Sequence, residues 1–261
     1  MALVPRTAIV LGVANHRSIA WSCVQSLLKK DYRVIFTYQN ERYAKTAQGL
    51  LSIANHQHLH ALPCDVEHEI PILFQERLPP LLGDSPIHAL VHAVAFAPAL
   101  KEGTLLTTTR AAFLQAHDTS VFSFLELAQQ ALPRLDSQAS IVTLSYLGAV
   151  RAVPHYNVMG PAKASLEALV RGLALELGPT IRVNAVSAGP VSTLAARGIH
   201  GFDRMKEDVK DRSLLQRNIT VEEVGETVAF LASPLSSGIT GQILYVDGGY
   251  SAVAGPKILK V

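Results

Sequence analysis

The sequence predicts an α/β fold in which one parallel sheet of seven strands carries helices on both faces. Two observations lead to this prediction. Short runs rich in β-forming residues alternate with longer runs whose apolar residues have helical spacing, a pattern typical of parallel strands joined by right-handed crossovers. Hydrophobic residues make up 49% of the 261 residues and charged residues only 17%, which is enough apolar material to bury such a sheet.

The order of elements predicts a doubly wound, Rossmann-like arrangement. Strands are expected at Thr7–Val13, Arg33–Tyr38, Leu59–Cys64, Ile87–Ala95, Ser140–Leu144, Ile181–Val186 and Gln242–Val246. Helices are expected at Ser18–Lys30, Glu41–Ala54, Ile70–Leu82, Arg110–Leu132, Ala162–Leu177 and Val221–Leu231. No repeat or linker divides the chain, so residues 1–261 are expected to form one domain. Residues 193–217, with glycines and charges around scattered apolar side chains, are interpreted as a mobile substrate lid.

Composition excludes several classes of partner. A net charge of +2 is too small to indicate binding to a nucleic acid. Neither a signal peptide nor a membrane-spanning run is recognisable, and Cys23 and Cys64 lack metal-ligand spacing, so a reduced, cytoplasmic protein is expected. His56, His58 and His60 alternate, but no carboxylate completes a ligand set, so no metal is expected.

The first strand and helix form a possible dinucleotide site. The strand ends at Gly12, and Ser18 is a good N-cap for the helix that continues through Ile19. Free amides at such a helix start can hold a pyrophosphate. Because the loop is not a full GxGxxG motif, an ordinary βα turn is the alternative.

The second and third strands end in residues suited to an adenosine. Gln39 can bond the ribose, since no acidic residue stands at that strand end. Arg17 and Arg42 are close enough in sequence to bind a 2′-phosphate together. The alternative is that both are solvated surface arginines. The residues alone therefore leave the choice between NADH and NADPH open. Asp65, followed by Val66, can hold the adenine amino group or act as a helix N-cap.

Tyr156 and Lys163 are candidate catalytic residues. Positions seven apart on one helix lie on the same face, so both side chains can address one bound cofactor. A lysine ammonium favours negative charge on a nearby phenol oxygen. Tyr146, after the fifth strand, is a second candidate phenol at the carboxyl edge of the sheet. The alternative is a packed tyrosine ring with a surface lysine. Pro161, between the two candidates, is expected in the first helical turn or at a bend.

Taken together, these segments resemble the bacterial NADH-dependent enoyl-acyl-carrier-protein reductases of the short-chain dehydrogenase/reductase superfamily. The resemblance runs from about Thr7 to Tyr250. Six residues separate Tyr156 from Lys163, whereas other members of the superfamily place lysine four residues after tyrosine. The remaining motifs are Gly12 to Ala20, Tyr38-Gln39-Asn40, Cys64-Asp65-Val66, Ser145-Tyr146-Leu147-Gly148 and Ser187-Ala188-Gly189-Pro190.

The resemblance implies hydride transfer from NADH to C3 of a trans-2-enoyl thioester on acyl carrier protein, a step of fatty-acid biosynthesis. It implies that Tyr156 stabilises the resulting enolate, that Lys163 holds the nicotinamide ribose and that Tyr146 shapes the site. Gln39 without a neighbouring acid resembles the members that use NADH rather than NADPH. A homotetramer is implied as well, with contacts near Asp247-Gly248-Gly249.

The same resemblance implies further binding residues. Those assigned to the cofactor are Val94, Val191, Thr193 and Ala195, in addition to Gly12, Ser18, Ile19, Gln39, Asp65, Val66 and Lys163. Those assigned to the acyl chain are Ala97, Met159, Ala196 and Phe202, and Ala195 also borders this pocket.

The chain departs from the family pattern at Ser22, Ala93 and Ala95, and each departure is expected to add bulk beside the cofactor. Two other functions therefore stay open. One is a related short-chain reductase that acts on a carbonyl substrate. The other is a non-catalytic NAD(H)-binding sensor, which keeps the fold and has lost turnover.

Overall fold

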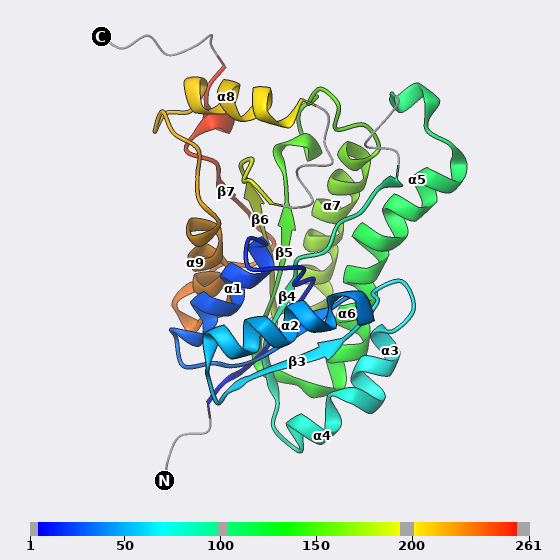
Figure 1. Ribbon diagram of the computed structural model, residues 1–261, viewed down its shortest axis with the longest axis vertical. Helices are drawn as coiled ribbons and strands as arrows, with labels where there is room; N and C mark the ends of the chain where they lie inside the picture. The colour runs from blue at the N-terminus through cyan, green and yellow to red at the C-terminus, as the bar shows by residue number, and fades with distance from the viewer. Residues whose placement is uncertain (1–4, 99–103, 194–200, 255–261) are drawn as a thin grey trace.

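The computed structural model describes residues 5–98, 104–193 and 201–254 and contains the predicted seven-stranded parallel sheet. Its strands lie in the order β3-β2-β1-β4-β5-β6-β7 (Figure 1). The strand order reverses between β1 and β4, the place where sheets of this type bind ligands beyond their carboxyl ends. The strands are β1 Thr7–Leu11, β2 Arg33–Tyr38, β3 Leu59–Pro63, β4 Ile87–His92, β5 Leu135–Ser145, β6 Arg182–Ala188 and β7 Ile243–Val246.

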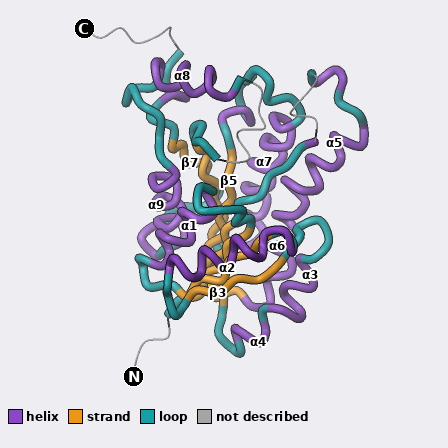
Figure 2. The backbone as a smooth tube through the Cα atoms, in the orientation of Figure 1, coloured by secondary structure: helices purple, strands orange, loops and turns teal. Residues whose placement is uncertain are grey.

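Alternate residues of the strands bury two separate helix layers. In β1, Ala8 and Val10 face α1 (Ile19–Leu28), α2 (Glu41–Ala54) and α9 (Val221–Ala232). Ile9 and Leu11 face the opposite layer, which includes α6 (Ser123–Ala131) and α7 (Met159–Leu177). Figure 2 shows the strands enclosed between helices, with α8 (Phe202–Arg212) crossing above their carboxyl ends.

Two predicted helices are each interrupted by a π-helical turn. The segment predicted as Arg110–Leu132 consists of α5 (Arg110–His117), the π-helical turn Asp118–Phe122 and α6. Here the Ser123 hydroxyl donates to the Thr119 carbonyl, 2.7 Å away, and competes with the regular backbone pattern. The segment predicted as Ile70–Leu82 consists of α3 (Ile70–Ile72), a π-helical turn and α4 (Pro79–Leu82), because its prolines lack amide hydrogens.

The strands β1 and β4 end earlier than predicted, at Leu11 and His92 instead of Val13 and Ala95. After these residues both segments leave the sheet. Gly12 allows the segment after β1 to lie close to the segment after β4. Gly12 has φ +93°, and a Cβ at this position would lie 2.5 Å from the Ala93 carbonyl oxygen. β5, by contrast, begins at Leu135, five residues before the predicted start at Ser140.

The prediction that Ser22 adds bulk beside the cofactor is wrong. Ser22 is buried where α1 meets α9, and a Cβ on Gly225 would lie 2.4 Å from the Ser22 hydroxyl oxygen. The missing side chain of Gly225 therefore makes room for the serine. Among the helices of the described residues, none combines the length and the hydrophobicity of a membrane-spanning segment.

Candidate active site

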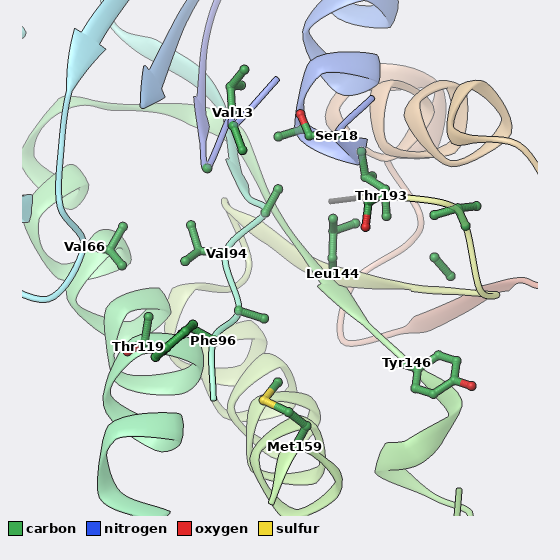
Figure 3. Close-up of a pocket in the computed structure, with 18 of the residues that line it drawn as sticks. Val13, Ser18, Val66, Val94, Phe96, Thr119, Leu144, Tyr146, Met159 and Thr193 are labelled. Carbon is green, nitrogen blue, oxygen red and sulfur yellow. The ribbon is translucent and has the colours of Figure 1, made fainter. Parts of the chain in front are cut away.

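A cavity of about 680 Å³ lies beyond the carboxyl ends of the strands. Figure 3 shows side chains from widely separated parts of the chain around it, from Ser18 to Met159. Fourteen predicted site residues line it: Gly12, Ser18, Ile19, Gln39, Asp65, Val66, Val94, Tyr146, Tyr156, Met159, Lys163, Val191, Thr193 and Phe202. The structure thus brings the two predicted ends of the site into one continuous space.

The start of α1 forms one wall of the cavity. Ser18 is the N-cap, and its hydroxyl accepts a hydrogen bond from the Trp21 amide at 3.2 Å. The first amides of a helix have no intrahelical acceptor. Since Ile19 and Ala20 also line the cavity, this helix start suits a pyrophosphate.

The end of the cavity at Gln39 and Asp65, where the sequence predicts the adenosine, is polar and acidic. The Gln39 amide donates to Asp65 at 3.2 Å, and the other carboxylate oxygen of Asp65 accepts from the Glu67 amide at 3.1 Å. Glu67 adds a second carboxylate to the cavity lining. The interpretation of Asp65 as a helix N-cap is wrong, because Glu69 occupies that position before α3.

Tyr156 lies in a turn before α7 and not on the helix, which corrects the predicted helix-face pairing with Lys163. The flanking His155 and Asn157 both have left-handed backbone, at φ 62° and 39°. Pro161 lies in the first turn of α7, as expected, because the helix begins at Met159. The turn is what directs Tyr156 into the cavity that Lys163 also lines.

The Tyr156 side chain is 9% exposed and packs edge-on against Tyr146, with ring centroids 4.8 Å apart. Burial raises the pKa of Tyr156 above its usual value, and it raises the pKa of Tyr146 to about 12. Both side chains are therefore neutral phenols at physiological pH. Each can donate a hydrogen bond, but neither is a base.

Lys163 is buried on α7, and its ammonium donates to the Leu144 carbonyl at 2.7 Å. Burial lowers the pKa of Lys163 to about 8, and the negative charge of Glu167 opposes this shift. Glu167 is in turn held by the Ser145 hydroxyl at 2.5 Å. The lysine is thus fixed in position and still predominantly charged near neutral pH.

Gly148 provides the space for the Tyr156 ring. A Cβ at position 148 would lie 2.4 Å from Cδ1 and 2.7 Å from Cε1 of that ring. We expect Gly148→Ala to displace the phenol and lower kcat at least about tenfold, because small misplacements are costly in catalysis. Gly172→Ala on α7 is the matched control, since nothing lies within 4 Å of its Cβ. Steady-state kinetics of both variants test this, and equal kcat values would contradict it.

Some predicted residues do not line the cavity. Ala97 is not among the lining residues described, but it packs behind them in a cluster with Tyr156 and Met159. Ala195 and Ala196 lie outside the described residues, as does the part of the lid at 194–200. The remainder of the predicted lid includes α8, whose Phe202 and Met205 face the cavity.

The cavity lining also includes residues that the sequence did not single out, among them Tyr43, Glu67 and Gln115. Of these, Glu67 had a usable signal, since it follows Asp65 by two residues beyond a predicted strand. Arg17 and Arg42 are exposed and are not among the described lining residues. Within the described ranges, no group of three or more His, Cys, Asp or Glu side chains is arranged to hold a metal.

Comparisons with known proteins agree with this geometry. A family model described as "Enoyl-(Acyl carrier protein) reductase" matches residues 12–251. The enoyl-acyl-carrier-protein reductase (NADH) of Bacillus subtilis is 45% identical over 95% of this chain and 97% of its own. That of Staphylococcus aureus strain MRSA252, named for NADPH, is 41% identical over 95% of this chain and 97% of its own. The Bacillus cereus enoyl-acyl carrier protein reductase crystal structure, containing NADP⁺ and an indole naphthyridinone, is 42% identical, with a TM-score of 0.90 over 97% of this chain and 100% of its own.

Proposed function

We propose that this chain, which belongs to the family of enoyl-(acyl carrier protein) reductases, reduces trans-2-enoyl thioesters of acyl carrier protein with NADH in fatty-acid biosynthesis. The observation that supports this most directly is one cavity lined by a neutral, buried phenol, Tyr156, and a buried lysine, Lys163. This combination suits a reaction that develops negative charge on a substrate oxygen.

The residues of the cavity fit a nicotinamide dinucleotide. The start of α1 offers amides for the pyrophosphate, Gln39 and Asp65 offer polar groups for the adenosine, and Lys163 offers an ammonium for the nicotinamide ribose. When bound, this cofactor supplies a hydride. Val191, a buried residue of the lining, is placed at the nicotinamide carboxamide by this assignment.

Side chains of the protein stabilise the negative charge that develops on the substrate oxygen. When hydride adds to C3, the electron pair of the double bond moves onto the thioester oxygen as an enolate, which is later protonated at C2. Tyr156 donates a hydrogen bond to that oxygen as charge develops. The Tyr146 ring holds the Tyr156 ring from the side, and Met159 and Phe202 offer apolar surface to the acyl chain.

The preference for NADH over NADPH is supported by charge. The carboxylate of Asp65 accepts a hydrogen bond from Gln39 at the end assigned to the adenosine, where a 2′-phosphate would add two further negative charges. Arg17 and Arg42, the cations that the sequence offers for a 2′-phosphate, are exposed and are not among the described lining residues. Some relatives are named for NADH and others for NADPH. The preference for NADH in this chain is therefore argued from its own residues.

Oxidation of NADH and NADPH with crotonyl and dodecenoyl thioesters tests the proposal. We expect turnover with both chain lengths and a kcat/KM about tenfold or more higher for NADH than for NADPH. Equal kcat/KM values would contradict the cofactor preference. Turnover of a 3-ketoacyl thioester alone would establish the carbonyl reductase, and tight NADH binding without turnover of any thioester would establish the sensor.

We propose that the enzyme is a homotetramer in the cytoplasm. Large apolar side chains are exposed before and along α5 and the π-helical turn that follows it, among them Leu106 (97%), Leu114 (58%) and Phe122 (48%). Such surface supports contacts between copies in a homotetramer, which light scattering can measure.

The free, buried Cys23 and Cys64 fit a cytoplasmic protein. The described part of the predicted lid, residues 201–217, is proposed to cover the acyl chain, because Phe202 and Met205 line the cavity.

A further inference from the structure

The π-helical turn Asp118–Phe122 holds the cavity wall at several points. Thr119 and Ser120 in the turn, and Ser123 just after it, are all buried. The Thr119 hydroxyl donates to Glu67 in the loop after β3. The Ser123 hydroxyl is 2.8 Å from Nε2 of His92, the last residue of β4. π-helical turns within α-helices are frequent at functional sites.

Ser120 makes the most specific of these contacts. Its hydroxyl accepts a hydrogen bond from the Phe96 amide at 3.0 Å and donates one to the Phe96 carbonyl oxygen at 3.2 Å. One fully buried side chain, 0% exposed, thus pairs both backbone groups of one residue. Phe96 needs such a partner because its segment has left the sheet at His92.

The segment that Ser120 holds forms part of the cavity wall. Figure 3 shows it running from Val94 to Phe96, between the end of β5 and the helix that carries Thr119. Ala95 and Phe96 line the cavity. The next residue, Ala97, packs in one apolar cluster with Tyr156 and Met159. A shift of the Phe96 backbone would therefore move both the wall and the packing of the catalytic phenol.

We propose that Ser120 is a positioning residue for the acyl chain, acting through the backbone of Phe96. This rests on the proposed function, since the wall serves an acyl chain only if an enoyl thioester is the substrate. The hydrogen bonds of Ser120 go to Phe96, with Met159 Sδ at 4.0 Å. The adenosine end is held separately by Gln39 and Asp65. Val94, which is assigned to the cofactor, lies two residues before Phe96 and makes none of these hydrogen bonds. Ser120 therefore governs substrate fit more than cofactor affinity.

The test compares Ser120→Ala with Ser140→Ala. Ser140 is also fully buried and its hydroxyl makes one backbone hydrogen bond, to the Leu231 carbonyl at 2.7 Å, away from the cavity lining. We expect Ser120→Ala to raise the KM for a dodecenoyl thioester about tenfold, with a smaller rise for the crotonyl thioester and NADH affinity within about twofold. Ser140→Ala should leave all three unchanged. Ser120→Thr, which keeps the hydroxyl, should restore most of the long-chain KM.

Hydrogen exchange of the Phe96 amide provides a readout that does not depend on activity. We expect protection in the wild type and in Ser120→Thr, and faster exchange in Ser120→Ala. An unchanged long-chain KM, or an equal loss of NADH affinity, would overturn the role of Ser120 while the wild-type activity stands. Absence of wild-type turnover with any enoyl thioester would instead overturn the proposed function, and the acyl-positioning role with it.

Discussion

Tyr156→Phe is expected to lower kcat/KM for enoyl thioesters by about 10²–10³, the usual cost of removing one donor to a developing oxyanion. The substitution removes only the hydroxyl, so the edge-on contact with Tyr146 and the fit against Gly148 are kept. Stopped-flow single-turnover kinetics with NADH measure the chemical step directly. NADH affinity should remain within about twofold, because the phenol is assigned to the substrate oxygen.

The control for this variant is Tyr245→Phe, because Tyr245 is exposed on β7 and lies outside the described cavity lining. It should retain wild-type kinetics. Because burial raises the pKa of Tyr156 above its usual value near 10, the phenol should cause no loss of activity as pH rises toward 10. A single-turnover rate in Tyr156→Phe equal to that of the wild type would remove Tyr156 from the mechanism.

Lys163→Met is expected to raise the Kd of NADH about 10- to 100-fold, since charge-assisted hydrogen bonds contribute about 1.5–3 kcal/mol each. Methionine keeps much of the apolar stem that α7 buries, so the loss reports on the ammonium. Calorimetric titration of NADH measures the affinity. Lys29→Met, at a side chain that is 70% exposed, should bind NADH as the wild type does.

The pH dependence of NADH binding follows from the same residue. Burial lowers the pKa of Lys163 to about 8, and the charged form is the one that donates to a ribose. Affinity should therefore be constant well below pH 8 and fall as pH rises through that value, by at most the roughly 10- to 100-fold expected for Lys163→Met. Lys163→Arg, which stays charged, should show no such decline. Equal affinity of the wild type at pH 7 and pH 9.5 would contradict this assignment.

The sheet could be predicted because its strands are buried on both faces. Ala8 and Ile9 are both fully buried, in opposite helix layers, so β1 is a short continuous apolar run, and such runs alternate with helical segments along the sequence. The cavity at the carboxyl ends then follows from the topology, which is why so many predicted binding residues line it.

The details of the active site could not be predicted because they depend on tertiary contacts. His155 and Asn157 adopt left-handed backbone although neither is glycine, and no local sequence pattern predicts this conformation. The π-helical turn at Asp118–Phe122 forms where side chains reach Glu67, Phe96 and His92, which are distant in sequence. The surroundings of Ser22 were predicted wrongly for the same reason, because its partner Gly225 lies about 200 residues further along the chain.

The contact between α1 and α9 makes the burial of α1 depend on a part of the chain that is synthesised late. Ser26 on α1 donates to Glu226 at 3.0 Å, and the Tyr32 hydroxyl donates to the Ala232 carbonyl at 3.1 Å, both across 200 residues. A nascent chain that has emerged only through β6 leaves this side of α1 uncovered. The helix whose start we propose for the pyrophosphate is among the first elements translated, yet one of its faces is expected to stay uncovered until α9 has followed.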